Sequence, residues 1–154
     1  MTALAASRLS GVVFWAAVAL AAPGAATGQS YTVPEPGTQA RADLLDALRP
    51  LAEWQLDAPV EFVVGTLRVA GDVAFASVTA QRPGGGTIDL AATPMVRRGG
   101  LSPAEIDGPR LDALLRRSGR TWVAVLHGIG ATDVWYANEA TCATWRAVLP
   151  EFCG

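Results

Sequence analysis

The sequence of 154 residues has no lysine, a single histidine and only two cysteines. Its twelve arginines stand against fourteen acidic residues, so there is no basic excess to neutralise phosphates, and nucleic-acid binding is disfavoured. One histidine and two cysteines are too few for a convincing zinc site, so we predict neither a metal nor a cofactor. The absence of lysine, with frequent alanine, glycine and arginine, indicates the codon bias of a GC-rich bacterial genome.

The sequence also lacks an apolar run long enough to span a bilayer, which takes roughly 20 residues. Its main run, Gly11 to Ala22, has twelve residues, and an arginine precedes it. Small residues follow as far as Gly28, and this order is typical of a secretory signal peptide. We predict a signal peptide over residues 1–28, cut after Gly28 or, as second choice, after Ala26. The mature chain is then periplasmic or secreted, with no membrane span.

Export changes the interpretation of the two cysteines, because an oxidising compartment favours disulfides. Cys142 and Cys153 both lie in the last thirteen residues, and a pair this close most simply forms a disulfide. The closed loop is short, so we expect a stabilisation of about 2–3 kcal/mol. A redox pair is the alternative, but the ten-residue spacer does not match a CxxC motif.

The 126 residues after the signal peptide fit a single domain. Residues 29–37 hold two prolines and a glycine and are predicted to form an extended lead-in to a domain over residues 38–154. A helix is expected to begin at Thr38, whose hydroxyl can cap the first turn. Leucines at helical spacing carry it to about Arg49, where Pro50 should end or kink it.

Two strands rich in β-branched residues are expected next, over Pro59–Val69 and Val73–Gln81. The turn at Gly71 should join them into a β-hairpin. A short third strand is predicted over residues 87–90, and a loop over residues 91–100.

The second half of the domain is predicted to combine short helices with one strong strand. Ser102 should cap a short helix, and a second helix should begin at Gly108. The strand is expected over Arg120–Ile129, followed by a helix over residues 138–148. The residues expected to share a face are Leu111, Leu114 and Leu115 in the second helix, and Trp122, Ala124 and Leu126 in the strand.

This order of elements predicts an α+β fold. An N-terminal helix should pack on a curved antiparallel sheet of about four strands, with a short helix at the C-terminus. Strands that are neighbours in the sequence tend to pair, which favours the antiparallel arrangement.

Motifs of known catalytic chemistry are absent from the sequence. No serine lies in a GxSxG elbow, and the glycines at 84–86 lack the lysine of a phosphate-binding loop. The one histidine, His127, lies at the end of the predicted strand and close in sequence to Asp133. One interpretation makes His127 a general base oriented by the carboxylate of Asp133, and the other makes it a surface residue at a strand end.

Aromatic side chains are the other candidates for a site. Trp122, Trp135 and Tyr136 follow one another closely in the last third of the chain. They either fill the core, since such rings bury a large area, or line a pocket or an interface.

Short stretches of the domain resemble small exported bacterial proteins that have no assigned activity. These stretches are Ala47 to Pro50, Pro59 to Val64, Gly71 to Ala76 and Gly130 to Trp135. The order of elements also resembles cystatin-like and NTF2-like folds, in which a curved antiparallel sheet wraps a helix. The first resemblance implies no catalytic residues, and the second implies a fold without a function.

Together these features favour an exported, non-catalytic domain that binds a small molecule or a partner protein in the cell envelope. One alternative is a small sheet-cup enzyme that uses His127 and Asp133 for acid–base chemistry. Another is an inhibitor or structural interaction protein, which would pair an exposed sheet edge with a partner strand.

Overall fold

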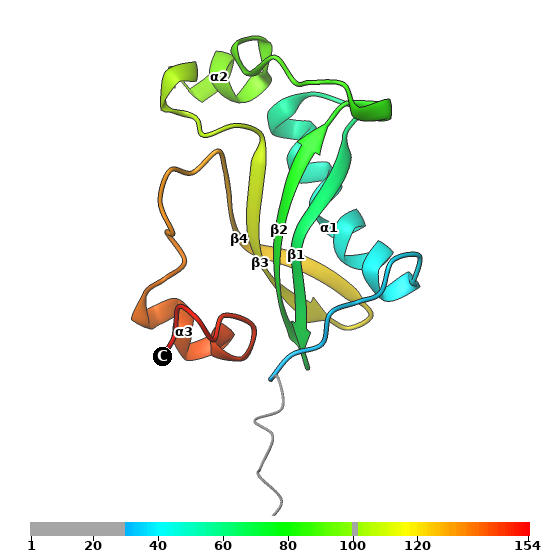
Figure 1. The fold of residues 1–154 in the computed structure, drawn as a ribbon, viewed down its shortest axis with the longest axis vertical. Helices are drawn as coiled ribbons and strands as arrows, with labels where there is room; N and C mark the ends of the chain where they lie inside the picture. Colours follow the sequence, from blue (N-terminus) through cyan, green and yellow to red (C-terminus); the bar gives the residue numbers. More distant parts are fainter. Residues whose placement is uncertain (1–29, 100–101) are drawn as a thin grey trace, which may run out of the picture.

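Four antiparallel strands, in the order β1-β2-β3-β4, form an open sheet around which the chain is arranged (Figure 1). The computed structural model describes residues 30–99 and 102–154, so the predicted signal peptide over residues 1–28 lies outside the described part. The helix, the antiparallel sheet and the short C-terminal helix confirm the predicted α+β fold. The strands are β1 Glu61–Ala70, β2 Val73–Gln81, β3 Arg110–Ser118 and β4 Thr121–Ile129, and the helices are α1 Gln39–Leu56, α2 Pro94–Gly99 and α3 Glu139–Trp145.

Helix α1 begins where the sequence predicts and continues beyond its predicted end. The hydroxyl of Thr38 accepts a hydrogen bond from the backbone N–H of Arg41, which is the expected cap. Pro50, expected to end or kink the helix, lies inside it. A proline there costs about 3 kcal/mol, and burial of the apolar stripe over two further turns offsets this. The fully buried side chains of the stripe are Leu44, Leu48, Ala52 and Leu56.

Strands β1 and β2 form the predicted hairpin. Ala70 pairs with Val73, so Gly71 and Asp72 alone make the turn. Gly71 has a φ of 57°, a conformation that favours glycine and that two-residue hairpin turns require. The glycine in the sequence therefore fixes the register of the hairpin.

Strand β3 occupies residues for which the leucine spacing predicts a helix. It lies between β2 and β4, and its side chains from Leu111 to Leu115 are all buried. Leu111 and Leu115 pack beneath α1, whereas Leu114 faces the opposite side of the sheet. A strand buried on both faces has no apolar–polar alternation, and leucines at these spacings fit a helix equally well. The segment forms a strand because its backbone groups then hydrogen-bond to β2 on one side and to β4 on the other.

A β-bulge in β4 changes which of its side chains share a face. Leu115 pairs with Ala124, but Leu114 pairs with Leu126, so Val125 is an extra residue in β4. Trp122 and Ala124, before the bulge, pack beneath α1, while Leu126 pairs with Leu114 and lies with it on the opposite face. The prediction of a single face is therefore wrong for the set Trp122, Ala124 and Leu126.

The connection between β2 and β3 contains a helix where a loop is predicted. Residues 94–99 form α2, which has Pro94 at its start and Arg97 and Arg98 in its last turn. Both features stabilise a short helix, because proline has no N–H to leave unpaired and arginine complements the helix dipole. The third strand predicted over residues 87–90 is also wrong, since these residues lead instead into a 3₁₀ turn at Leu90–Ala92.

The two short helices predicted between residues 102 and 118 are both absent as α-helices. Ser102 forms the expected capping box with Glu105, whose Oε2 accepts from the backbone N–H of Ser102 at 3.1 Å. The capped segment is a single 3₁₀ turn, Pro103–Glu105, because β3 begins five residues later.

The sheet separates two hydrophobic clusters, and α1 and α3 lie on opposite sides of it (Figure 1). Helix α1 covers one face, and its leucines meet buried residues from all four strands. Helix α3 and the C-terminal residues cover part of the other face, where Phe75, Leu114 and Trp145 pack together. The indole N–H of Trp145 donates to the carbonyl of Leu115 at 3.1 Å. The C-terminal segment is therefore a second layer on the sheet.

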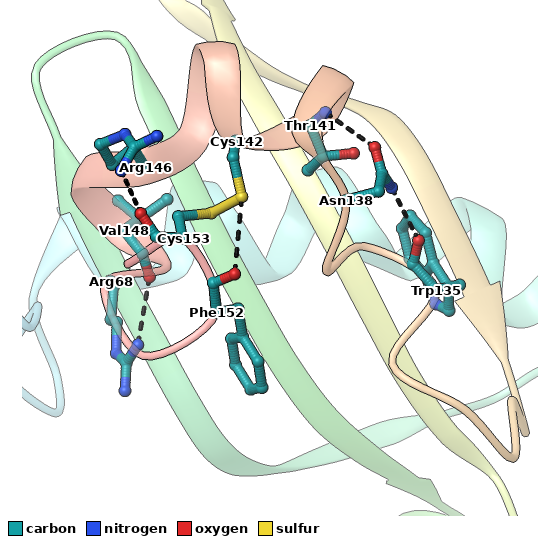
Figure 2. Close-up of a disulfide and its surroundings, with 9 residues drawn as sticks. All are labelled: Arg68, Trp135, Asn138, Thr141, Cys142, Arg146, Val148, Phe152 and Cys153. Carbon is teal, nitrogen blue, oxygen red and sulfur yellow. Dashed lines mark hydrogen bonds between the residues drawn. A yellow bond between two sulfur atoms is a disulfide. The ribbon is translucent and has the colours of Figure 1, made fainter.

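A disulfide closes this C-terminal layer (Figure 2). Cys142 of α3 is bonded to Cys153, with 5.4 Å between their Cα atoms, and both residues are buried. Arg146 donates to the carbonyl of Cys153, and the side chain of Asn138 caps α3 by accepting from the N–H of Thr141 at 3.0 Å. The predicted disulfide and the predicted C-terminal helix are both confirmed.

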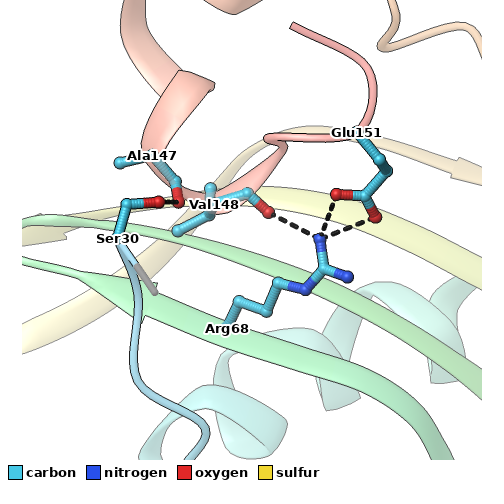
Figure 3. Close-up of polar contacts among 5 residues, drawn as sticks. All are labelled: Ser30, Arg68, Ala147, Val148 and Glu151. Carbon is cyan, nitrogen blue, oxygen red and sulfur yellow. Dashed lines mark hydrogen bonds and ion pairs between the residues drawn. The ribbon is translucent and has the colours of Figure 1, made fainter. Parts of the chain in front are cut away.

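Arg68 of β1 ties the C-terminal layer to the sheet (Figure 3). Its Nη1 donates to both carboxylate oxygens of Glu151 at 2.7 Å and to the carbonyl of Val148 at 3.1 Å. The lead-in contributes a further contact, since the hydroxyl of Ser30 donates to the carbonyl of Ala147 at 2.7 Å. The hydrogen bond from Arg68 lowers the pKa of Glu151 below its ordinary value of 4.5, although desolvation opposes the effect.

The ion pair between Arg68 and Glu151 predicts a pH-dependent contribution to stability. Because the pKa of Glu151 is lowered in the folded chain, this contribution is complete above the ordinary value of 4.5 and is lost as the pH falls through the lowered pKa. The Glu151→Gln variant should be less stable than the natural chain at pH 7, by no more than about 1 kcal/mol because the carboxylate is partly exposed. Urea unfolding of both chains from pH 7 to pH 3 should show this difference shrinking. A difference that stays constant with pH would contradict the assignment.

Candidate functional site

A groove of about 480 Å³ lies where α1, α2 and β4 meet. The last turn of α1 provides two of its lining residues, α2 provides three, and the end of β4 provides three. His127, the histidine singled out from the sequence, is among them and is exposed. The lining residues are Trp54, Gln55, Met95, Arg98, Gly99, His127, Gly128 and Ile129.

Trp54 and Arg98 form a stacked pair on one wall of the groove. The guanidinium carbon of Arg98 lies 3.9 Å from the centre of the Trp54 ring. Arg98 also donates to the carbonyls of Trp54 and Pro94, which fixes its orientation. Trp54 is 67% exposed, which is unusual for so large an apolar ring, and the stacking holds it in place. The pair offers an aromatic face beside a fixed positive charge.

The polar lining of the groove is cationic or neutral. Arg98 supplies a guanidinium with five N–H donors, and only two of its nitrogens take part in the contacts described above. His127 adds an imidazole, and Gln55 adds an amide. Among the described residues that line the groove there is no carboxylate. The chemistry of the groove therefore matches an anionic group next to an apolar body.

The structure does not bring Asp133 into the groove with His127. Asp133 lies in the exposed segment after β4, outside the set of lining residues. Within residues 30–99 and 102–154, no hydrogen bond or ion pair joins the two side chains. The general-base hypothesis for His127 and Asp133 therefore lacks geometric support here.

The three aromatic candidates, Trp122, Trp135 and Tyr136, are placed in packing positions rather than around this groove. Trp122 is 5% exposed and belongs to the core beneath α1. Tyr136 packs on the other face, with its ring centre 4.9 Å from that of Phe75 and 5.3 Å from that of Phe152. Burial, followed by the nearby charge of Asp112, raises the pKa of Tyr136.

Trp135 packs against Gly128, one of the residues that line the groove. A Cβ added at Gly128 would lie only 2.9 Å from the indole nitrogen of Trp135, so glycine is required for this close approach. The indole N–H of Trp135 is buried and has no hydrogen-bond partner among the described residues. Asn138 holds the segment by donating to the carbonyl of Trp135 at 3.0 Å (Figure 2). Gly128 thus lines the groove with one side and packs against the ring of Trp135 with the other.

Sequence reasoning did not select Trp54 as a candidate site residue, although it is one of five tryptophans in the chain, and it missed Arg98. Trp54 follows Pro50, where the helix was expected to stop, and Arg98 lies in a segment predicted as a loop. A detectable pattern was present for α2: a proline at residue 94, two arginines at residues 97 and 98, and glycine after them. That order is typical of the start and end of a short helix.

Comparisons with protein-family models, with curated proteins and with solved structures give no match to the chain. The resemblance to small exported bacterial proteins and to cystatin-like or NTF2-like folds therefore stays a prediction. In the part of the chain that the structure describes, no cluster of three potential metal ligands occurs, and no helix has the length and apolarity to cross a membrane.

Proposed function

We propose that this protein is an exported, non-catalytic binding domain whose groove takes a small organic anion. The carboxylate, or an equivalent anionic group, would contact Arg98 and His127. The apolar or aromatic part of the ligand would lie against Trp54 and Met95. The observation that carries the proposal is a groove lined by a guanidinium and an imidazole, with no carboxylate among its described lining residues.

Two further features support binding rather than catalysis. Arg98 is held by stacking and hydrogen bonds before any ligand arrives, so little ordering is needed when an anion binds. The groove provides no carboxylate to orient His127, which acid–base chemistry of the predicted kind requires. An exported setting fits the disulfide, because such bonds persist in oxidising compartments. A periplasmic or secreted location is part of this proposal.

The test is a panel of aromatic and aliphatic carboxylates, each measured beside its neutral amide, for example 2-naphthoate and 2-naphthamide. Binding is followed by the NMR shifts of the tryptophan indole N–H groups. We expect the carboxylates to shift the resonance of Trp54 and to bind about tenfold more tightly than the amides, since a charge-assisted hydrogen bond is worth 1.5 kcal/mol or more. The Arg98→Gln variant should lose this preference.

The matched control is Arg97→Gln, which removes the same charge from the neighbouring residue of α2. Arg97 contacts the carbonyl of Ala92 and does not line the groove. The control should therefore bind the panel as the natural chain does. If no carboxylate shifts the Trp54 resonance, or if acids and amides bind equally, the proposed function is wrong.

A further inference from the structure

Strand β4 is the last strand of the sheet, and among the described residues it pairs with β3 alone. In residues 30–99 and 102–154, no backbone group outside β3 hydrogen-bonds to the backbone of residues 121–129. The opposite edge, on β1, is partly covered, because Thr32 exchanges two backbone hydrogen bonds of 2.8 and 2.9 Å with Val69. A free edge is a template for a further strand.

The composition of β4 does little to block such pairing. Between Thr121 and Ile129 the strand has no proline and no acidic or arginine residue. Three apolar side chains are exposed along it, at 46%, 47% and 41% for Val123, Val125 and Leu126. The bulge at Val125 interrupts the regular edge but leaves residues 126–129 as an uninterrupted stretch.

Helix α1 runs beside β4, and a hollow lies at each end of the seam between them. One is the groove described above, between Trp54 of α1 and His127 of β4. The other, of about 270 Å³, lies between Asp43 of α1 and Trp122 of β4. The distance along β4 from Trp122 to Gly128 is about 20 Å, which is the length of roughly six residues of an extended chain.

The cationic groove lies where the edge ends. The chain leaves the sheet at Gly130, which has a φ of 64°, directly after the three residues that line the groove. A strand that pairs along β4 toward Ile129 therefore has its last residue beside Arg98 and His127. If that last residue is the C-terminus of the added peptide, its free carboxylate supplies a negative charge at that point, and no acidic side chain is needed.

We infer that the edge of β4 and the groove form one peptide-binding site, which adds an extended peptide as a strand parallel to β4 and holds its C-terminal carboxylate at Arg98 and His127. This inference rests on the proposed function, and it identifies the ligand of the groove as the C-terminal end of a polypeptide. Main-chain hydrogen bonds to the edge supply affinity, and the fixed charge selects a chain terminus. The exposed valines and Leu126 provide apolar contacts for alternate side chains of the peptide.

Three probes test the inference: an acetylated hexapeptide of alternating threonine and valine with a free carboxylate, the same peptide amidated, and an amidated version with one internal aspartate. The free acid should bind at least about tenfold more tightly than either amide. Hydrogen exchange should slow at alternate amides within residues 126–129, because pairing protects outward-facing N–H groups. The Arg98→Gln variant should abolish the difference between acid and amide.

A second pair of variants separates the edge from the groove. Val125→Lys places a charge on the edge, and Val134→Lys places the same charge on an exposed valine outside β4. We expect Val125→Lys to weaken binding of the free-acid peptide about tenfold and to leave the affinity for 2-naphthoate unchanged. Val134→Lys should change neither affinity.

The possible failures are distinguishable. If 2-naphthoate binds but the acid and amide peptides bind equally, or β4 gains no protection, the inference is wrong and the groove is a site for small anions alone. If the internal aspartate peptide matches the free acid, the ligand is an acidic side chain and the inference of a chain terminus is wrong. If neither the peptides nor 2-naphthoate bind, the proposed function fails as well.

Discussion

Replacing Leu114 by alanine should lower the free energy of unfolding by about 2–5 kcal/mol. Leu114 is fully buried in the middle of β3, between the sheet and the C-terminal layer, where it packs with Phe75, Tyr136 and Trp145. The truncation removes apolar contacts and leaves a cavity that a rigid sheet cannot close. Urea denaturation at neutral pH measures the loss. The exposed Ser118 at the end of the same strand provides the control, since Ser118→Ala should change stability by less than about 0.5 kcal/mol.

The same strand allows a sharper test of the arrangement of its leucines. In β3, Leu111 and Leu115 pack beneath α1, and Leu114 packs on the other face. The effects of Leu111→Ala and Leu114→Ala should therefore add, because the two truncations open separate clusters. A helix would place all three leucines on one stripe and couple every pair. If the losses of unfolding free energy from Leu111→Ala and Leu114→Ala do not add in the double variant, the assignment of β3 as a strand is contradicted.

The contrast between β2 and β3 explains how far the sequence could predict this fold. The hairpin of β1 and β2 is encoded locally, by β-branched runs on either side of a glycine turn, and the structure confirms this hairpin. The identity of β3 depends on two neighbours distant in sequence, which no local pattern contains. Its leucine spacing permits both structures, and only the pairing of both edges decides between them.

The bulge at Val125 and the continuation of α1 through Pro50 also depend on contacts that no local sequence pattern contains. Each breaks a local rule, and each is compensated by packing that forms only in the folded chain. Both also position the groove, since Trp54 lies beyond Pro50 and His127 lies beyond the bulge. Sequence reasoning found His127 because it is the single histidine, and it missed the stacked Arg98 because stacking joins segments 44 residues apart.

The disulfide, in contrast, follows from the spacing of the cysteines and the predicted compartment alone, and its removal is the second large effect that we expect. The double variant Cys142→Ala, Cys153→Ala should lose about 3 kcal/mol of unfolding free energy, because the unfolded chain regains the entropy of the open loop. The loss should appear first in the C-terminal layer, where Cys153 and Glu151 lie on the segment that the disulfide closes. Reduction of the natural chain should cause a loss of the same size.

Reductant supplies the control, since it should leave the double variant unchanged. The core beneath α1 contains neither cysteine, so the indole resonance of Trp122 should keep its position while that of Trp145, in the cluster with both cysteines, moves. The contact between Arg68 and Glu151 should weaken at the same time, because the tail that carries the carboxylate is then held by fewer bonds. Equal stability of the oxidised and reduced chains would show that packing of Trp145 and Leu149 alone holds the layer, and that the disulfide contributes nothing to it.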